Sequence, residues 1–177
     1  MVRDYLESIL KDFYKTESDR ADKLDGAVNL PTAILTVLFG VGALYLEKRP
    51  NPVWNFWVVA FYIISTIYFF LFIFAGFCLI RSYFHYRYRM TANPQQIVDF
   101  ESGMREHYEV ELEDGKAVDD AVKRELQESL IEQYAEASQQ NRQRNLDRTN
   151  WLFRTTRLII AALVMMIASN GPLFFGQ

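Results

Sequence analysis

The sequence has few of the residues on which catalysis and cross-linking depend. It holds one cysteine, Cys78, and two histidines in 177 residues. A single cysteine excludes a disulfide within the chain. The sequence contains no glycine-rich phosphate loop, no nucleophile elbow and no pair of metal ligands at helical spacing. We therefore expect a protein that is not an enzyme and that holds neither a cofactor nor a metal ion.

Charge is missing from three long apolar stretches, Ala27–Leu46, Val53–Ile80 and Leu158–Phe175. A bilayer core about 30 Å thick requires roughly 20 apolar residues in a helix, and each stretch approaches or exceeds that length. The stretches predict an all-α integral membrane protein with three transmembrane helices. The mean hydropathy of -0.06 hides them, because the residues between the second and third stretches are strongly polar.

Basic residues beside these stretches predict the orientation. Arginines follow the second stretch and lead into the third: Arg81, Arg87, Arg89, Arg142, Arg144, Arg148, Arg154 and Arg157. Residues 1–25 also carry more Lys and Arg than the turn over 47–52. Because basic flanks stay in the cytoplasm, we expect a cytoplasmic amino terminus and a carboxyl terminus outside.

The chain divides into five expected parts. They are an amphipathic cytoplasmic helix over 1–25, transmembrane helices over 26–46 and 53–81, a cytoplasmic helical region over 82–150 and a third transmembrane helix over 151–175. Asn93 and Pro94 predict the start of a short helix that ends near Glu111. Residues 117–150 contain no Gly or Pro, so a long helix is expected to continue into the third span.

The long helix carries an apolar stripe that becomes polar toward the membrane. Its polar part is Asn141, Arg144, Asn145 and Arg148. Such a seam can set the register of helices from several copies of a chain, which favours a homo-oligomer. The alternative is a solvated helix packed on residues 2–24 and 94–111 of its own chain.

Small and polar residues recur every three or four positions in the first span: Asn29, Thr32, Thr36, Gly40 and Ala43. This polar face of the first span can pack on another helix of the same chain, because small residues allow close approach in lipid. Alternatively, copies of the face surround an axis and line a water-filled path. No Asp, Glu, Lys or Arg lies mid-membrane, which argues against a proton-coupled transporter.

Aromatic and basic residues alternate over 81–89. Arg81, Arg87 and Arg89 are predicted to contact lipid headgroups, and the bilayer is then a partner. Binding to nucleic acid is the more specific interpretation of this segment. The neighbouring bilayer is the nearer polyanion, however, so we do not expect direct binding of nucleic acid. His107 lies among glutamates whose spacing matches no calcium loop, as in a solvated acidic helix.

The stretch Ser18–Asp25, leading into a glycine-containing span, resembles the SLATT and Pycsar-type small transmembrane effectors of bacterial antiphage defence. The resemblance is one of layout and covers about the first 90 residues. It implies an oligomeric effector that forms or gates a pore or ion channel and disrupts the bacterial inner membrane. It also implies a trigger that reaches the cytoplasmic helices, such as a sensor protein or a nucleotide signal. The alternative is a scaffold or accessory subunit that anchors a soluble cytoplasmic partner through the acidic face of residues 99–136.

Overall fold

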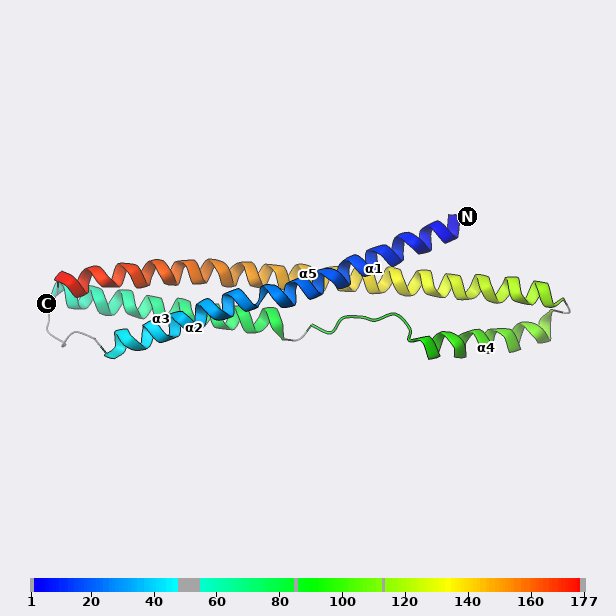
Figure 1. Cartoon of the computed structure of the whole chain (residues 1–177), viewed down its shortest axis with the longest axis horizontal. Helices are drawn as coiled ribbons and strands as arrows, with labels where there is room; N and C mark the ends of the chain where they lie inside the picture. Colours follow the sequence, from blue (N-terminus) through cyan, green and yellow to red (C-terminus); the bar gives the residue numbers. More distant parts are fainter. Residues whose placement is uncertain (1, 48–54, 85, 113, 176–177) are drawn as a thin grey trace. The chain divides into compact units, whose positions relative to one another are not determined.

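The computed structural model describes residues 2–47, 55–84, 86–112 and 114–175, and these are helical almost throughout (Figure 1). The helices are α1 (Val2–Ala27), α2 (Asn29–Glu47), α3 (Phe56–Tyr83), α4 (Pro94–Glu111) and α5 (Gly115–Phe175), and no strand occurs in the described residues. The stretches Arg3–Glu47, Phe56–Tyr83 and Gly115–Pro172 are helical, and each is long and apolar enough to cross a membrane. The all-α prediction with three such helices is confirmed.

The ends of the helices follow local rules. The side chain of Asn93 accepts a hydrogen bond from the Gln96 backbone at 2.8 Å, and the Gln96 side chain accepts one from the Asn93 backbone at 3.0 Å. This capping box starts α4 at Pro94, as expected. The predicted turn between the first two spans, including the start of the second at Val53, lies outside the described residues.

α5 is one unbroken helix of 61 residues. It begins at Gly115, two residues before the predicted start at Ala117, and runs through Asn150 into the third apolar stretch. Pro172 lies inside its last turns, where a proline removes a single backbone hydrogen bond near the end.

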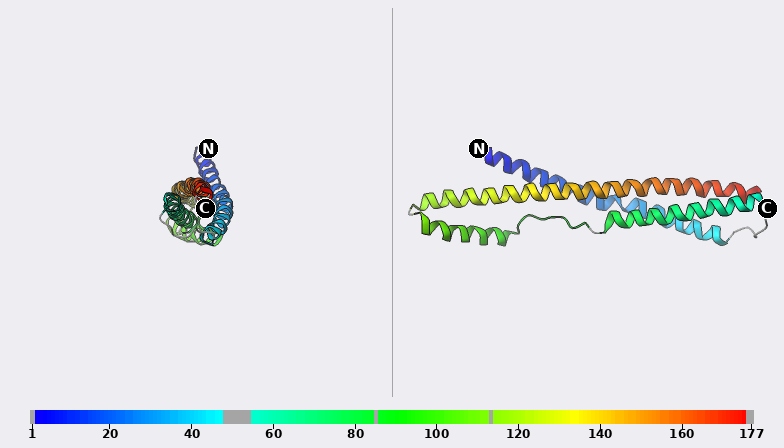
Figure 2. Two further views of the ribbon diagram at one scale, coloured as in Figure 1. Left: turned by 90° about the vertical axis from the view of Figure 1, so that its left-hand side faces the viewer. Right: turned by 180° about the vertical axis from the view of Figure 1, so that it is seen from behind.

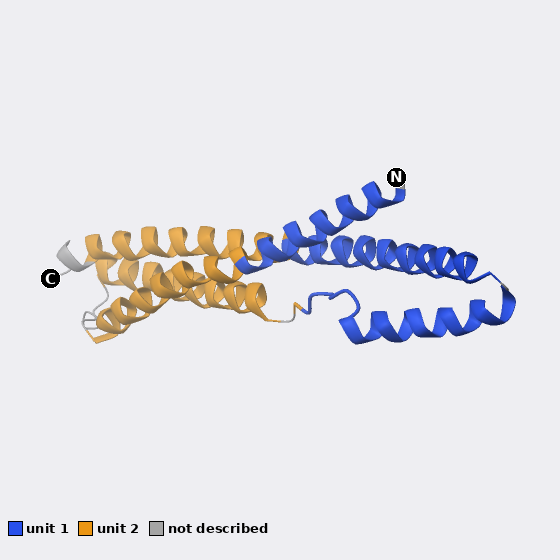
Figure 3. Cartoon of the chain, turned by 45° about the vertical axis from the view of Figure 1, so that its right-hand side comes forward, with its two compact units in different colours: residues 1–22, 87–145 blue, residues 23–86, 146–177 orange. Residues whose placement is uncertain are grey.

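The chain forms two compact units, each treated separately (Figure 3). Unit 1 comprises residues 1–22 and 87–145, and unit 2 comprises residues 23–86 and 146–177. Within unit 1, α4 lies beside the first part of α5 in the views of Figures 1 and 2. Within unit 2, α3 lies beside the second part of α5 in the same views.

Unit 2 has an apolar core where α2, α3 and α5 meet. Its buried members are Leu35, Leu38, Tyr68, Ala75, Ile159 and Ala162. Ala75 of α3 and Ala162 of α5 are fully buried, and their small side chains allow the two helices to approach closely. Two tyrosines add hydrogen bonds between helices, since Tyr68 donates to the Leu38 carbonyl at 2.5 Å and Tyr45 donates to the Met166 carbonyl at 3.0 Å.

Unit 1 combines aromatic and polar contacts on α5 with the buried apolar side chains of Val118, Val122 and Ala137. Tyr14 of α1 packs edge-on against Tyr134, with ring centroids 5.8 Å apart. Arg105 of α4 bonds to Glu101 at 3.0 Å and to Asp119 of α5 at 2.9 Å. The hydrogen bonds to Glu101 and Asp119 raise the pKa of Arg105, so this exposed link between α4 and α5 stays charged.

Candidate functional site

The polar face of the first span is exposed in unit 2. Asn29, Thr32, Thr36, Gly40 and Ala43 are all exposed. The buried residues of α2 lie on a different face and are Pro31, Leu35, Leu38 and Gly42. The polar face is therefore not the one by which α2 packs against the rest of its own chain.

The hydroxyl groups on this face are already hydrogen-bonded within α2. Thr32 donates to the Val28 carbonyl at 2.8 Å, and Thr36 donates to the Thr32 carbonyl at 3.0 Å. Such bonds to the preceding turn allow threonine to face an apolar solvent. A Cβ built on Gly40 meets no atom within 4 Å, so the middle of the face is open.

A recess adjoins the amino-terminal end of the same face. Asn29 and Thr32 border a cavity of about 330 Å³. Its other walls are Val28, which directly precedes α2, and residues at or just after the end of α3, namely Leu79, Ile80, Tyr83 and Phe84. An amide and a hydroxyl thus share this cavity with apolar and aromatic side chains.

The polar residues of α5 have partners within the chain. In unit 1, Asn141 pairs with both backbone groups of Arg89, because its oxygen accepts from the Arg89 N–H at 2.9 Å and its nitrogen donates to the Arg89 carbonyl at 3.0 Å. Asn145 accepts from the Tyr88 hydroxyl at 2.6 Å and donates to the Glu17 carbonyl and carboxylate, each at 2.8 Å. Both asparagines are buried.

Arg148 has its partners in unit 2. Its side chain is 2 % exposed; it donates to the Ser82 carbonyl at 3.0 Å and to the carboxylate of Asp25. Its guanidinium also lies 5.7 Å from the centre of the Tyr86 ring. Arg144, the fourth predicted member of the seam, is half-buried.

These contacts lie within one chain, but of the partners only Glu17 belongs to the segments 2–24 and 94–111 on which the long helix was expected to pack. The amides of Asn141 and Asn145 and the guanidinium of Arg148 are hydrogen-bonded without a second copy. Asn141, Asn145 and Arg148 therefore do not need a second copy of the chain to satisfy their polar groups, and the homo-oligomer stays a prediction.

We expect Asn141→Leu to lower the free energy of unfolding by about 1 to 2 kcal/mol, because it removes the partner of two backbone groups. Chemical denaturation would measure the loss. Hydrogen exchange at the Arg89 amide should rise at the same time. Asn141→Asp is the matched control, since it keeps the acceptor for that N–H and should protect it better than leucine does. Equal exchange in the two variants would contradict the assignment.

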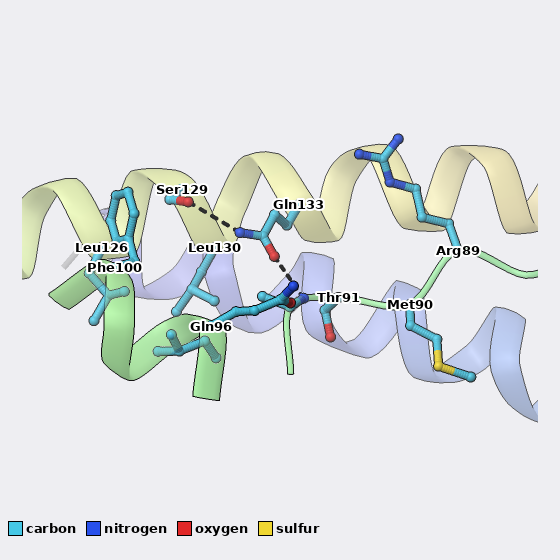
Figure 4. Close-up of a pocket in the computed structure, with 11 residues that line it drawn as sticks. Arg89, Met90, Thr91, Gln96, Phe100, Leu126, Ser129, Leu130 and Gln133 are labelled. Carbon is cyan, nitrogen blue, oxygen red and sulfur yellow. Dashed lines mark hydrogen bonds between the residues drawn. The ribbon is translucent and has the colours of Figure 1, made fainter. Parts of the chain in front are cut away.

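A second cavity, of about 450 Å³, lies in unit 1 between α5 and the segment that leads into α4 (Figure 4). The Gln133 side chain crosses it, accepting from the Ala92 N–H at 2.9 Å and donating to Ser129 at 3.2 Å. Figure 4 shows Leu126, Leu130 and Phe100 gathered at one end. Polar and apolar side chains both line the cavity.

The three arginines predicted to contact headgroups differ in their surroundings. Arg81 is in the last turn of α3, and its guanidinium lies 5.8 Å from the centre of the Trp151 ring. Arg89 forms an ion pair with Glu136, and Arg87 is exposed. His85, between these residues in the sequence, lies outside the described residues.

No metal centre emerges in the described part of the chain, where no three His, Cys, Asp or Glu side chains are placed to hold an ion. His107 contacts Glu111 at 3.5 Å in an exposed pair on α4. Comparisons with protein-family models, with curated proteins and with solved structures found no match to this chain.

Sequence reasoning missed three residues that position these groups. Gly42 and Tyr68 decide which face of α2 packs, and Asp25 pairs with Arg148. Asp25 was visible as the last charge before the first apolar stretch. No sequence signal connected it with an arginine so far along the chain.

Proposed function

We propose that this protein spans the bacterial inner membrane three times and assembles there into an oligomer through the exposed polar face of α2, forming or gating a pore. The observation that carries the proposal is the separation of two faces on one helix. α2 meets its own chain through Leu35, Leu38 and Gly42, while Thr36 and Gly40 remain exposed. In lipid, a face of small residues provides the close approach that helix association requires.

The orientation rests on the basic flanks, which favour a cytoplasmic amino terminus and a carboxyl terminus outside. Unit 1 would then lie in the cytoplasm, where a sensor protein or a nucleotide signal can reach it. The layout of the first 90 residues or so, which resembles small effectors of antiphage defence, supports membrane disruption as the outcome.

Gly40→Leu tests the assembly. The open space at Gly40 leaves the fold of the single chain intact, but a branched side chain there would keep the α2 helices of two copies apart. We expect the variant to shift from oligomer to monomer in mild detergent and to lose at least tenfold in vesicle conductance. A tenfold loss corresponds to a weakening of about 1.4 kcal/mol in the free energy of assembly. Light scattering and dye release measure the two effects.

Val37→Phe is the matched control, because it adds comparable apolar volume on another exposed side of α2, where Val37 is 65 % exposed. It should leave both readings unchanged. A wild-type chain that runs as a monomer, or equal losses in both variants, would overturn the proposal.

A second candidate function is a membrane scaffold for a soluble partner. It is favoured by α4, which has no buried residue and leaves Val98 and Val110 exposed at 55 % and 85 %. Thr36→Leu separates the two functions. A pore should lose conductance when a hydroxyl is replaced by an apolar side chain on its lining, whereas a scaffold should tolerate that change in a helix that faces lipid.

A further inference from the structure

Two arginines of unit 2 gather at one tryptophan. The guanidinium of Arg81, in the last turn of α3, lies 5.8 Å from the centre of the Trp151 ring. The guanidinium of Arg154, three residues further along α5, lies 4.8 Å from the same centre. Both are exposed. The indole ring therefore attracts both cations by cation–π interactions.

These two cations have no acid beside them. Within the described ranges, neither Arg81 nor Arg154 has a carboxylate at ion-pair distance, whereas Arg89 pairs with Glu136 and Arg148 with Asp25. The two positive charges repel one another, and an anion that contacts both adds an attraction that offsets this repulsion. A phosphate matches them, because the planar fork of arginine binds its oxygens in pairs.

An apolar strip leads away from Arg81 along α3. Phe77, Phe74 and Phe70 follow one another at spacings of three or four residues, so they share a face with Arg81. Their exposed fractions are 50 %, 60 % and 70 %. Phe77 also meets the Trp151 ring edge-on, with centroids 6.4 Å apart. A ligand with a phosphate at one end and a hydrocarbon chain at the other fits this surface.

We propose that Arg81, Arg154 and Trp151 form a binding site for one anionic phospholipid, whose phosphate contacts the two guanidinium groups and whose acyl chain lies along Phe77 and Phe74. The site rests on the proposed membrane placement but does not require a pore. It differs from general attraction to an anionic surface, which every exposed arginine near the bilayer would share. Arg157 provides that comparison, since its guanidinium lies over Phe153, at 4.2 Å, and not over Trp151.

Quenching of Trp151 by brominated lipids tests the site. The full-length chain carrying Trp54→Phe and Trp57→Phe, which leaves Trp151 as its one tryptophan, is placed in vesicles that mix phosphatidylglycerol and phosphatidylcholine, with either the first or the second lipid brominated. We expect the anionic lipid to bind beside Trp151 at least fivefold more strongly than the zwitterionic lipid. An arginine beside an anionic lipid contributes about fivefold, so Arg154→Gln should lower the preference by about that factor.

Arg157→Gln is the matched control, since it removes one charge from the same helix. It should leave the lipid preference within about twofold of the starting value. Equal losses in the two variants would show general surface attraction and overturn the site. Equal quenching by both lipids in the starting chain would overturn it too.

Two further arms identify the source of the phosphate. Millimolar glycerol phosphate should leave the quenching unchanged, and relief of quenching would assign the site to a soluble phosphate. An added oligonucleotide should likewise have no effect, and relief would indicate nucleic acid instead. Quenching by neither lipid would mean that Trp151 does not meet the bilayer, which would reject the membrane placement and not the lipid preference alone.

Discussion

Gly42→Leu is expected to lower the free energy of unfolding by about 3 kcal/mol, because it forces a side chain into the closest approach of α2 and α3. A Cβ at Gly42 would lie 3.1 Å from the Tyr68 hydroxyl and 3.2 Å from Cε1 of the same ring. Tyr68 is 2 % exposed and is fixed by its bond to the Leu38 carbonyl. It therefore cannot turn aside without breaking that bond.

Denaturant titration in a detergent that keeps the starting protein and all variants monomeric measures the loss, with Gly40→Leu as the control at an open position of the same helix. The control should unfold like the starting protein. Gly42→Ala should cost less than leucine, and its cost should fall further in a Tyr68→Phe background, where the nearest atom is gone. Equal destabilisation by leucine at Gly40 and Gly42 would contradict the packing.

The spans and helix starts could be predicted because each depends on neighbouring residues. Uncharged stretches of sufficient length predict the apolar helices, and Asn93 with Pro94 predicts where α4 begins. The face by which α2 packs could not be predicted in this way. Gly40 and Gly42 are equally small, and the choice between them is made by Tyr68, a residue of another helix whose hydroxyl reaches the α2 backbone.

The polar residues of α5 were open to two interpretations for a similar reason. Helical periodicity places Asn141, Asn145 and Arg148 on one face, but it gives no information on what they meet. Their partners include the Arg89 backbone and the Tyr88 hydroxyl, which belong to an irregular segment without a periodic pattern. A buried amide that satisfies an irregular backbone looks the same in sequence as an amide that joins two copies of a helix.

The other large effect is expected at the pair formed by Asp25 and Arg148. The two side chains differ greatly in exposure, since Arg148 is 2 % exposed and Asp25 is 58 % exposed. Asp25→Asn leaves the buried guanidinium charged while removing the carboxylate that neutralises it. We expect a loss of about 3 kcal/mol in the free energy of unfolding, the lower end for breaking a buried pair, because one partner reaches water.

Arg148→Met should cost less, about 1 to 2 kcal/mol, although it removes the larger side chain. It leaves the charge on Asp25, which water can hydrate, and the buried carbonyl of Ser82 loses a donor. The double variant should then be about as stable as Arg148→Met alone, because the asparagine no longer faces a buried charge. Denaturant titration of the three variants gives the ranking. A larger loss for Arg148→Met than for Asp25→Asn would mean that packing and the bond to Ser82, and not charge neutralisation, set the contribution of Arg148.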